Sequence, residues 1–457
     1  MIPLLLLAPL LRRQKPSTAV CQLPKEHQVK LPNGLSLHHL PYRNLPLVEV
    51  ELVIPGGSRL DPTGKEGLAN LVAKVLTKGT KGRNATEISE TIDFLGANLD
   101  VEAGHDYIAV SAEFLVQDLD EMLSLLAEIV MLPAFPPEEV GRACRQVEAQ
   151  IEQIRDEPER LIQRHFSRLL FGEHPYGRPV LGWERSLCTI TREDLAAFHR
   201  ATFRPDEAIL AIVGDLDAVT AQEKVTEIFS AWRGEGAVSP PPVFPPPERV
   251  SGRKIHLIDK PDATQTQILI GNLGVSRSDP DYFPLLVANT LFGGAFTSRL
   301  NRTIRVERSL SYGAWSSFQF RKERGAFLVG TYTKTETTRE ALEVVLEELA
   351  RLHREGVTDA EVRRAKSYLA GQFSLKIEPP EARAYQLAMI HFFGLPEDYM
   401  ETYPAHIEAV SIADVERVIH RHFPLDDLLI VLLGKADEIE PGVRDLGEVN
   451  RRDLLDH

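Results

Sequence analysis

The chain has 457 residues, of which 43% are hydrophobic and 26% are charged. This length exceeds one ordinary hydrophobic core, so we expect a folded protein of two or more domains and not a disordered or fibrous one. Its 66 acidic and 52 basic residues give a net charge of -14. That balance argues against a nucleic-acid partner, because binding to phosphates requires clustered Lys and Arg. An acidic protein can still attract basic peptides.

The N-terminal segment, residues 1–23, is apolar and then basic. The run IPLLLLAPLL begins at Ile2, is about as long as a signal-peptide core and is too short to span a bilayer. No Lys or Arg precedes it, whereas Arg12, Arg13 and Lys15 follow it, which reverses the secretory order. The segment also lacks acidic residues, as transit peptides do. Export to the periplasm, a cytoplasmic location and organelle import all stay open, and no transmembrane span is predicted.

The three cysteines are Cys21, Cys144 and Cys188. They are odd in number and have no CxxC spacing. Neither a disulfide framework nor a cysteine-built zinc site is therefore indicated.

Hydrophobic periodicity predicts similar elements in the two halves of the chain. In the first half it predicts strands at 47–55 and 106–115 and helices at 68–76, 85–95, 118–130 and 138–155. In the second half it predicts a helix at 283–291, strands at 266–272, 311–320 and 325–333, and helices at 336–354, 358–371 and 380–393. Strand pairs followed by long helices predict an α+β fold of antiparallel sheets with helices packed mainly on one face.

A proline-rich segment lies between the halves. The sequence GEGAVSPPPVFPPPERVSG, residues 234–252, has no helical or strand period and predicts an extended, semi-rigid linker. The predicted domains are then residues 24–233 and 253–457.

The two predicted domains also repeat short sequences. LVIPGGSRLDP, from Leu52, matches IGNLGVSRSDP, from Ile270, and ILAIVGDL, from Ile209, matches LLIVLLGK, from Leu428. A repeat of this length indicates duplication of a whole domain and not a solenoid of small units.

The sequence GGSRLDP followed by the pattern GLAxxxxxxLxKGT, which ends at Thr80, resembles the insulinase, pitrilysin and mitochondrial processing peptidase family of metallopeptidases. The likeness covers nearly the whole chain from about Leu23, including the duplicated domains and the linker. It implies two homologous domains that form a clam-like bowl. Active members carry H-x-x-E-H just before the KGT element, in which two histidines bind zinc and the glutamate is the general base; a distal glutamate is the third ligand.

The zinc-binding residues of that motif are missing from this chain. The matching positions run from Asn70 through Ala73 to Lys74. Asparagine is a poor zinc ligand, alanine has no donor atom, and a protonated lysine repels a dication. The resemblance implies that the chain lacks the catalytic residues and binds no metal at this motif.

The resemblance places the third ligand near Gln150, on a later helix. Glu148 and Glu152 flank this position, so a rescued site using these glutamates and a displaced histidine is one alternative. The simpler interpretation is that both are solvated helix charges. Neither H-E-x-x-H nor H-x-x-E-H occurs in the sequence, and the 14 histidines are scattered.

A second element of the family is retained. The segment from Leu291 to Gly313 resembles the C-domain element in which an arginine, and a tyrosine seven residues later, reach across to the catalytic cleft. Arg305 and Tyr312 match this spacing. A hydroxyl and a guanidinium can donate hydrogen bonds to a peptide carbonyl on which negative charge develops. Alternatively, Arg305 is one of several surface arginines and Tyr312 is a strand residue packed on the sheet.

The same segment contains Gly293 and Gly294. The resemblance makes this pair a candidate for a flexible substrate loop near the cleft, as in the substrate-scanning subunits of the family. A double glycine on its own equally indicates a turn.

In two-subunit members of the family, one chain bears the zinc and the other supplies the arginine and tyrosine. The resemblance therefore implies a non-catalytic subunit of a heterodimeric zinc metallopeptidase, inactive alone, that binds unfolded peptide with a homologous H-x-x-E-H partner holding the zinc. A structural or assembly subunit of the same fold is an alternative, and a stand-alone peptidase with a divergent metal site is another. Homodimerisation and the identity of the substrate stay open.

Overall fold

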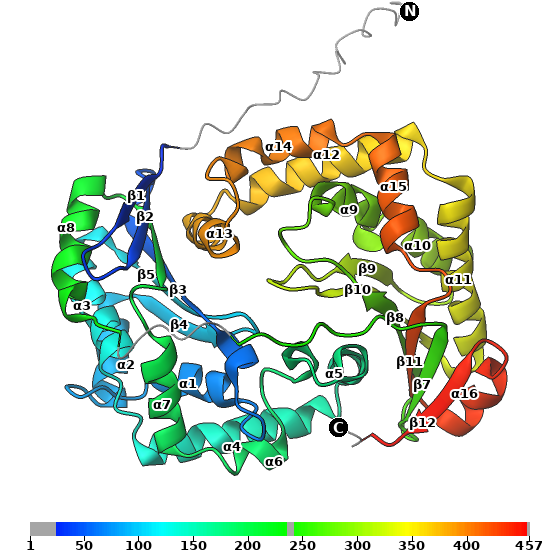
Figure 1. Ribbon diagram of the computed structural model, residues 1–457, viewed down its shortest axis with the longest axis horizontal. Helices are drawn as coiled ribbons and strands as arrows, with labels where there is room; N and C mark the ends of the chain where they lie inside the picture. The colour runs from blue at the N-terminus through cyan, green and yellow to red at the C-terminus, as the bar shows by residue number, and fades with distance from the viewer. Residues whose placement is uncertain (1–23, 235–241, 455–457) are drawn as a thin grey trace, which may run out of the picture.

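The computed structural model describes residues 24–234 and 242–454, which form two six-stranded sheets with helices around them (Figure 1). The predicted segment 1–23, Cys21 and part of the predicted linker lie outside these residues. The linker residues 242–252 contain no helix or strand. No helix in the described ranges combines the length and apolar character needed to cross a bilayer.

The first sheet has the strand order β1-β2-β6-β3-β5-β4. Its strands are β1 His27–Lys30, β2 Ser36–Pro41, β3 Leu47–Pro55, β4 Asn98–Ala103, β5 Tyr107–Leu115 and β6 Ile209–Gly214. The helices of this half are α1 Leu68–Leu76, α2 Ala85–Leu95, α3 Leu119–Met131, α4 Pro137–Ile154, α5 Pro158–Phe171, α6 Glu184–Leu187, α7 Arg192–Thr202 and α8 Ala218–Ile228.

The second sheet has the order β12-β7-β11-β8-β10-β9. Its strands are β7 Arg253–Asp259, β8 Gln265–Leu273, β9 Ala314–Phe318, β10 Ala326–Lys334, β11 Leu428–Gly434 and β12 Glu448–Arg452. The helices are α9 Tyr282–Asn289, α10 Arg299–Asn301, α11 Thr338–Glu355, α12 Asp359–Lys376, α13 Pro380–Phe393, α14 Tyr399–Ala409, α15 Ile412–His422 and α16 Ala436–Val443. Two π-helical turns, η5 Thr290–Gly294 and η6 Arg302–Glu307, flank α10.

The predicted α+β class of two similar sheet-and-helix halves is confirmed. The repeated segments occupy equivalent strands, since Leu52 lies in β3 and Ile270 in β8, each fourth in its sheet. The sheets are mixed and not purely antiparallel, because β2 pairs with β6, and β11 and β12 pair with β7, in parallel. The chain reaches β6 and β11 only after several helices, which allows a parallel return. The domain boundaries stay predictions.

Each half supplies one helix to the sheet of the other half. Helix α13 of the second half packs on β6 and β3, where Leu387 and Ala388 join the cluster that contains Val53 and Ala211. Helix α5 of the first half packs on β8 and β11, around Phe166. Figure 1 shows orange α13 beside the first sheet and teal α5 beside the second. Helices of the same half cover the opposite face of each sheet.

A polar joint ties α13 to the N-terminal strands. One carboxylate oxygen of Glu26 accepts hydrogen bonds from His38 Nδ1, at 2.7 Å, and from His391 Nε2, at 2.8 Å. The two imidazole rings are stacked with their centroids 3.5 Å apart. Burial raises the pKa of Glu26, but the hydrogen bonds from His38 and His391 outweigh it and lower the pKa to about 2.

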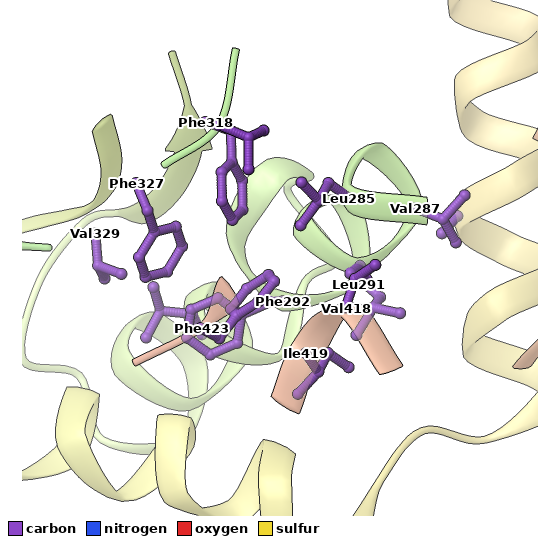
Figure 2. Close-up of a cluster of buried hydrophobic side chains, with 14 of the residues drawn as sticks. Leu285, Val287, Leu291, Phe292, Phe318, Phe327, Val329, Val418, Ile419 and Phe423 are labelled. Carbon is purple, nitrogen blue, oxygen red and sulfur yellow. The ribbon is translucent and has the colours of Figure 1, made fainter. Parts of the chain in front are cut away.

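The hydrophobic core of the second half is centred on Phe423. Its ring lies 5.6 Å from the ring of Phe292, 5.3 Å from that of Phe318 and 4.8 Å from that of Phe327, between centroids. All of these side chains are buried. Figure 2 shows these four side chains in one cluster with Leu285, Leu291 and Ile419.

We expect Phe423→Ala to lower the free energy of unfolding by about 3–5 kcal/mol, because truncating a buried aromatic ring leaves a cavity. Phe94→Ala, at a position that is 87% exposed, is the control and should change it by less than about 0.5 kcal/mol. Urea unfolding followed by circular dichroism measures both. Equal effects of the two variants would contradict this account of the core.

We expect Glu26→Gln to lower the free energy of unfolding by about 1–2 kcal/mol at pH 7, because the charge-assisted hydrogen bonds to both rings are weakened. The pKa of Glu26 is lower in the folded protein than its ordinary value of 4.5. Its contribution is therefore complete above that value and is lost as the pH falls towards 2. Urea titrations from pH 7 down to pH 3 test this, with exposed Glu90→Gln as the control. A pH-independent difference between wild type and Glu26→Gln would contradict it.

Candidate functional site

The helix that carries the degenerate motif is anchored at its N-terminus by a buried aspartate. Asp61, from the SRLDP turn, accepts hydrogen bonds from the backbone N–H groups of Gly67 and Ala69, both at 2.8 Å. Burial raises the pKa of Asp61 to about 7 in spite of these two hydrogen bonds. The GGSRLDP and GLA segments thus act together in holding α1, and this role needs no metal.

The motif positions do not form a metal site. Asn70 is buried and its Nδ2 has no hydrogen-bond partner, Ala73 is 2% exposed, and Lys74 is half-buried. Together they offer one amide and one amine. This donor set does not fit zinc, which takes thiolates, neutral imidazoles or carboxylates. The apolar residues of α1 pack against α4 and α7, so the helix remains part of the core.

Gln150 lies exposed on α4, the helix that packs against α1. Glu148 is half-buried and Glu152 is exposed. Among the residues that the structure describes, one group of histidines and carboxylates has the spacing of metal ligands, and it is the Glu26 joint. Neither Glu148 nor Glu152 belongs to it. The alternative of a rescued site on α4 thus gains no support from the described residues.

Arg305, Tyr312, Gly293 and Gly294 line one cavity of about 500 Å³. No residue of α1 lines it, and Gln150 does not line it. The structure therefore brings together the predicted residues of the second half and leaves the degenerate motif apart from them.

Arg305 and Tyr312 lie at an exposed part of this cavity. Tyr312 is 78% exposed and precedes β9, so it is not a strand residue packed on the sheet. The predicted strand at 311–320 is shorter than expected. The guanidinium carbon of exposed Arg305 lies 4.7 Å from the centroid of the Phe296 ring. Among the described residues, Arg305 makes no ion pair, whereas Arg299 is paired with Glu361 at 2.6 Å.

Local hydrogen bonds fix the backbone around this pair. Asn301 is buried, donates to Phe296 O at 2.6 Å and accepts from Ala314 N at 3.3 Å. Arg305 itself lies in the π-helical turn η6. Such turns are rare and occur often at functional sites. The two side chains are therefore exposed, but they are attached to a firmly held backbone.

The glycine pair adopts a helical turn and not the loop that was considered. Gly293 and Gly294 end the π-helical turn η5. A Cβ atom on Gly293 would lie 2.4 Å from Ser316 Oγ and 2.6 Å from Ser316 N. The absence of a side chain is thus required by close packing of the turn against β9.

Helix α5 also contributes to this cavity, although no functional residue was predicted on it. Glu159, Ile162 and Gln163 of this helix line it, together with the aromatic residues Phe296 and Trp315. The sequence PERLIQRHFSRLLF has apolar residues at helical spacing after a proline, which is a sufficient signal for the helix. Nothing in the sequence reveals that this helix packs on the sheet of the other half.

Two sheet-and-helix halves that share the order of five of their six strands, one with a motif helix that lacks ligands, define a protein of the metallopeptidase-like class. Residues 42–184 match the family model of insulinase, peptidase family M16, and residues 189–369 match the model of the peptidase M16 inactive domain. The chain belongs to the M16 family of peptidases.

Individual relatives agree with this assignment. An uncharacterized zinc protease of Mycobacterium leprae is 31% identical over 350 residues, which cover 76% of this chain and 78% of that protein. One of Rickettsia bellii is 27% identical over 408 residues, which cover 86% and 94%. A crystal structure described as the peptidase M16 inactive domain from Pseudomonas fluorescens has a TM-score of 0.84 and 27% identity, covering 90% of this chain and 98% of that one.

We expect Gly293→Ala to lower the free energy of unfolding by about 1–3 kcal/mol, because the added methyl group overlaps Ser316. The matched control is Gly371→Ala in α12, where a Cβ meets nothing within 4 Å. This control should be stabilised by about 0.5–1 kcal/mol, because alanine favours a helix over glycine. Thermal unfolding of both variants decides the question. A stabilised Gly293→Ala variant would show that the position is a mobile loop.

Proposed function

We propose that this chain is a non-catalytic subunit of a heterodimeric zinc peptidase and that it supplies Arg305 and Tyr312 to the site of a homologous partner. The observation that carries the proposal is that both side chains are exposed at one cavity while the motif of α1 offers no zinc ligand set. The partner would carry H-x-x-E-H and hold the zinc. The resemblance of the chain to a structure described as an inactive domain supports the non-catalytic part.

The proposed chemistry of the pair is electrostatic. The guanidinium of Arg305 and the hydroxyl of Tyr312 are hydrogen-bond donors for which the described residues provide no acceptor. Donors that are already positioned can stabilise the negative charge that develops on a peptide carbonyl during hydrolysis. The fixed backbone around Asn301 supports this role, because it limits the reorganisation needed at the moment of reaction.

The first sheet carries two buried carboxyl groups on the face that α13 covers. Glu49 on β3 lies directly opposite Glu113 on β5. Glu51, also on β3, lies opposite Ala211 on β6, on the face that α13 covers. Burial and neighbouring carboxylates raise the pKa of Glu49 to about 9 and that of Glu51 to about 7.

The edge strand β4 supports binding of an extended peptide. It is the last strand of the first sheet, it lies next to α1, and only β5 pairs with it. An extended peptide can pair with such an edge through its backbone.

Reconstitution with a partner tests the proposal. The isolated chain should bind no stoichiometric zinc by mass spectrometry and cleave no peptide. Addition of a homologous H-x-x-E-H chain encoded beside it should produce cleavage. Tyr312→Phe and Arg305→Ala should each lower kcat/KM of the mixture by about 10²–10³-fold, as loss of one oxyanion donor does.

Exposed Arg363→Ala in α12 is the control and should leave the activity of the mixture unchanged. Normal activity with both Tyr312→Phe and Arg305→Ala would favour a structural or assembly subunit. Zinc-dependent cleavage by the isolated chain would favour a stand-alone peptidase.

A further inference from the structure

A second cavity, of about 240 Å³, lies beside the first along α5. Gln163 and Leu269 line both cavities, so the two are neighbours. Helix α5 supplies residues to each of them, and the second sheet closes the other side. None of the residues proposed above for peptide hydrolysis lines this second cavity.

The lining of this cavity is strongly basic. It includes Arg160, Arg164, Arg178 and Arg321, and no Asp or Glu is among the described residues that line it. His105 also lines the cavity, and burial lowers its pKa well below the ordinary value, which leaves it neutral. The whole chain has a net charge of -14, so a cavity lined by four arginines differs in charge from the rest of the protein.

Two of the arginines have buried N–H groups without acceptors. Arg164 Nε and Arg321 Nη1 are buried and have no hydrogen-bond partner. Arg164 donates from Nη2 to Gly182 O at 3.3 Å and lies 4.4 Å from the Trp183 ring. Arg321 donates from Nη2 to Gln319 at 3.2 Å. A buried donor without an acceptor destabilises the fold unless a ligand or water accepts its hydrogen bond.

The nearby carboxylates are already engaged elsewhere. Asp106 accepts hydrogen bonds from the Tyr176 hydroxyl at 2.6 Å and from Lys322 N at 3.1 Å. Glu157 pairs with Arg160 at 3.0 Å. The acceptors for Arg164 and Arg321 would therefore have to come from outside the chain. Guanidinium groups are well suited to this role, because their N–H groups match the oxygens of a carboxylate or phosphate.

We propose that the cavity around Arg164 and Arg321 binds an oxyanion, and that this oxyanion is the C-terminal carboxylate of a peptide. The peptide assignment rests on the proposed function, since the preceding residues of the peptide would occupy the neighbouring cavity at Gln163. The binding of an oxyanion does not rest on it. The small volume admits a terminal group and excludes a folded partner.

Isothermal titration of the full chain, without any partner subunit, tests the proposal. The probes are an N-acetylated tetrapeptide of alanine and leucine with a free carboxylate, the same peptide as its amide, and inorganic phosphate. The free acid should bind at least about 10-fold more tightly than the amide, which corresponds to one charge-assisted contact of about 1.4 kcal/mol. Phosphate should compete with the free acid.

Arg164→Gln and Arg321→Gln should each abolish the preference for the free acid, and Arg321→Lys should retain part of it. Exposed Arg363→Gln is the matched control, and circular dichroism verifies that each variant is folded. Even if a variant fails to fold, comparing the free acid with the amide on the wild-type chain tests whether the protein prefers a free carboxylate.

Equal binding of acid and amide together with phosphate binding at these arginines would overturn the peptide assignment. Absence of binding by all three probes, or unchanged binding by both glutamine variants, would overturn the site itself. Because the zinc-bearing partner takes no part, either result is independent of the reconstitution experiment.

Discussion

The architecture depends on one constraint, which is that neither sheet can bury both of its faces with helices of its own half. The remaining apolar face of the first sheet is covered by α13, and that of the second sheet by α5. Burial of apolar area is the main stabilising contribution in folding, so this reciprocal exchange fixes how the halves lie relative to each other. Polar contacts then add direction to this apolar contact: the Glu26 joint, the hydrogen bond from Lys322 N to Asp106 and the ion pair of Arg59 with Glu323.

The same exchange creates the two cavities. Helix α5 crosses from the first half and lies on β8, so its residues face Arg305 and Tyr312 on one side and Arg321 on the other. The candidate site is thus a product of both halves, although its predicted residues all belong to the second. By contrast, α1 is held by the packing of its apolar residues and by the hydrogen bond from Gly67 N to Asp61. Neither contact needs a metal.

Much of the fold could be predicted from the sequence. The strand predicted at 47–55 and the helices at 85–95 and 380–393 agree with β3, α2 and α13. The strand alternates polar and apolar residues, α2 begins after the capping residue Asn84, and α13 begins at Pro380. The edge strands β1, β4 and β12 were missed, since they are only 4, 6 and 5 residues long. The clustering of Arg305, Tyr312 and Gly293 followed from a resemblance, whereas the arginine cavity depends on contacts between distant segments and has no local signal.

The exchange of α5 and α13 also changes what the proline-rich segment does. Since each half contributes a helix to the core of the other, the covalent connection at residues 234–252 is not what keeps them associated. Separation of the two halves would expose the apolar sheet face that α13 or α5 of the other half covers.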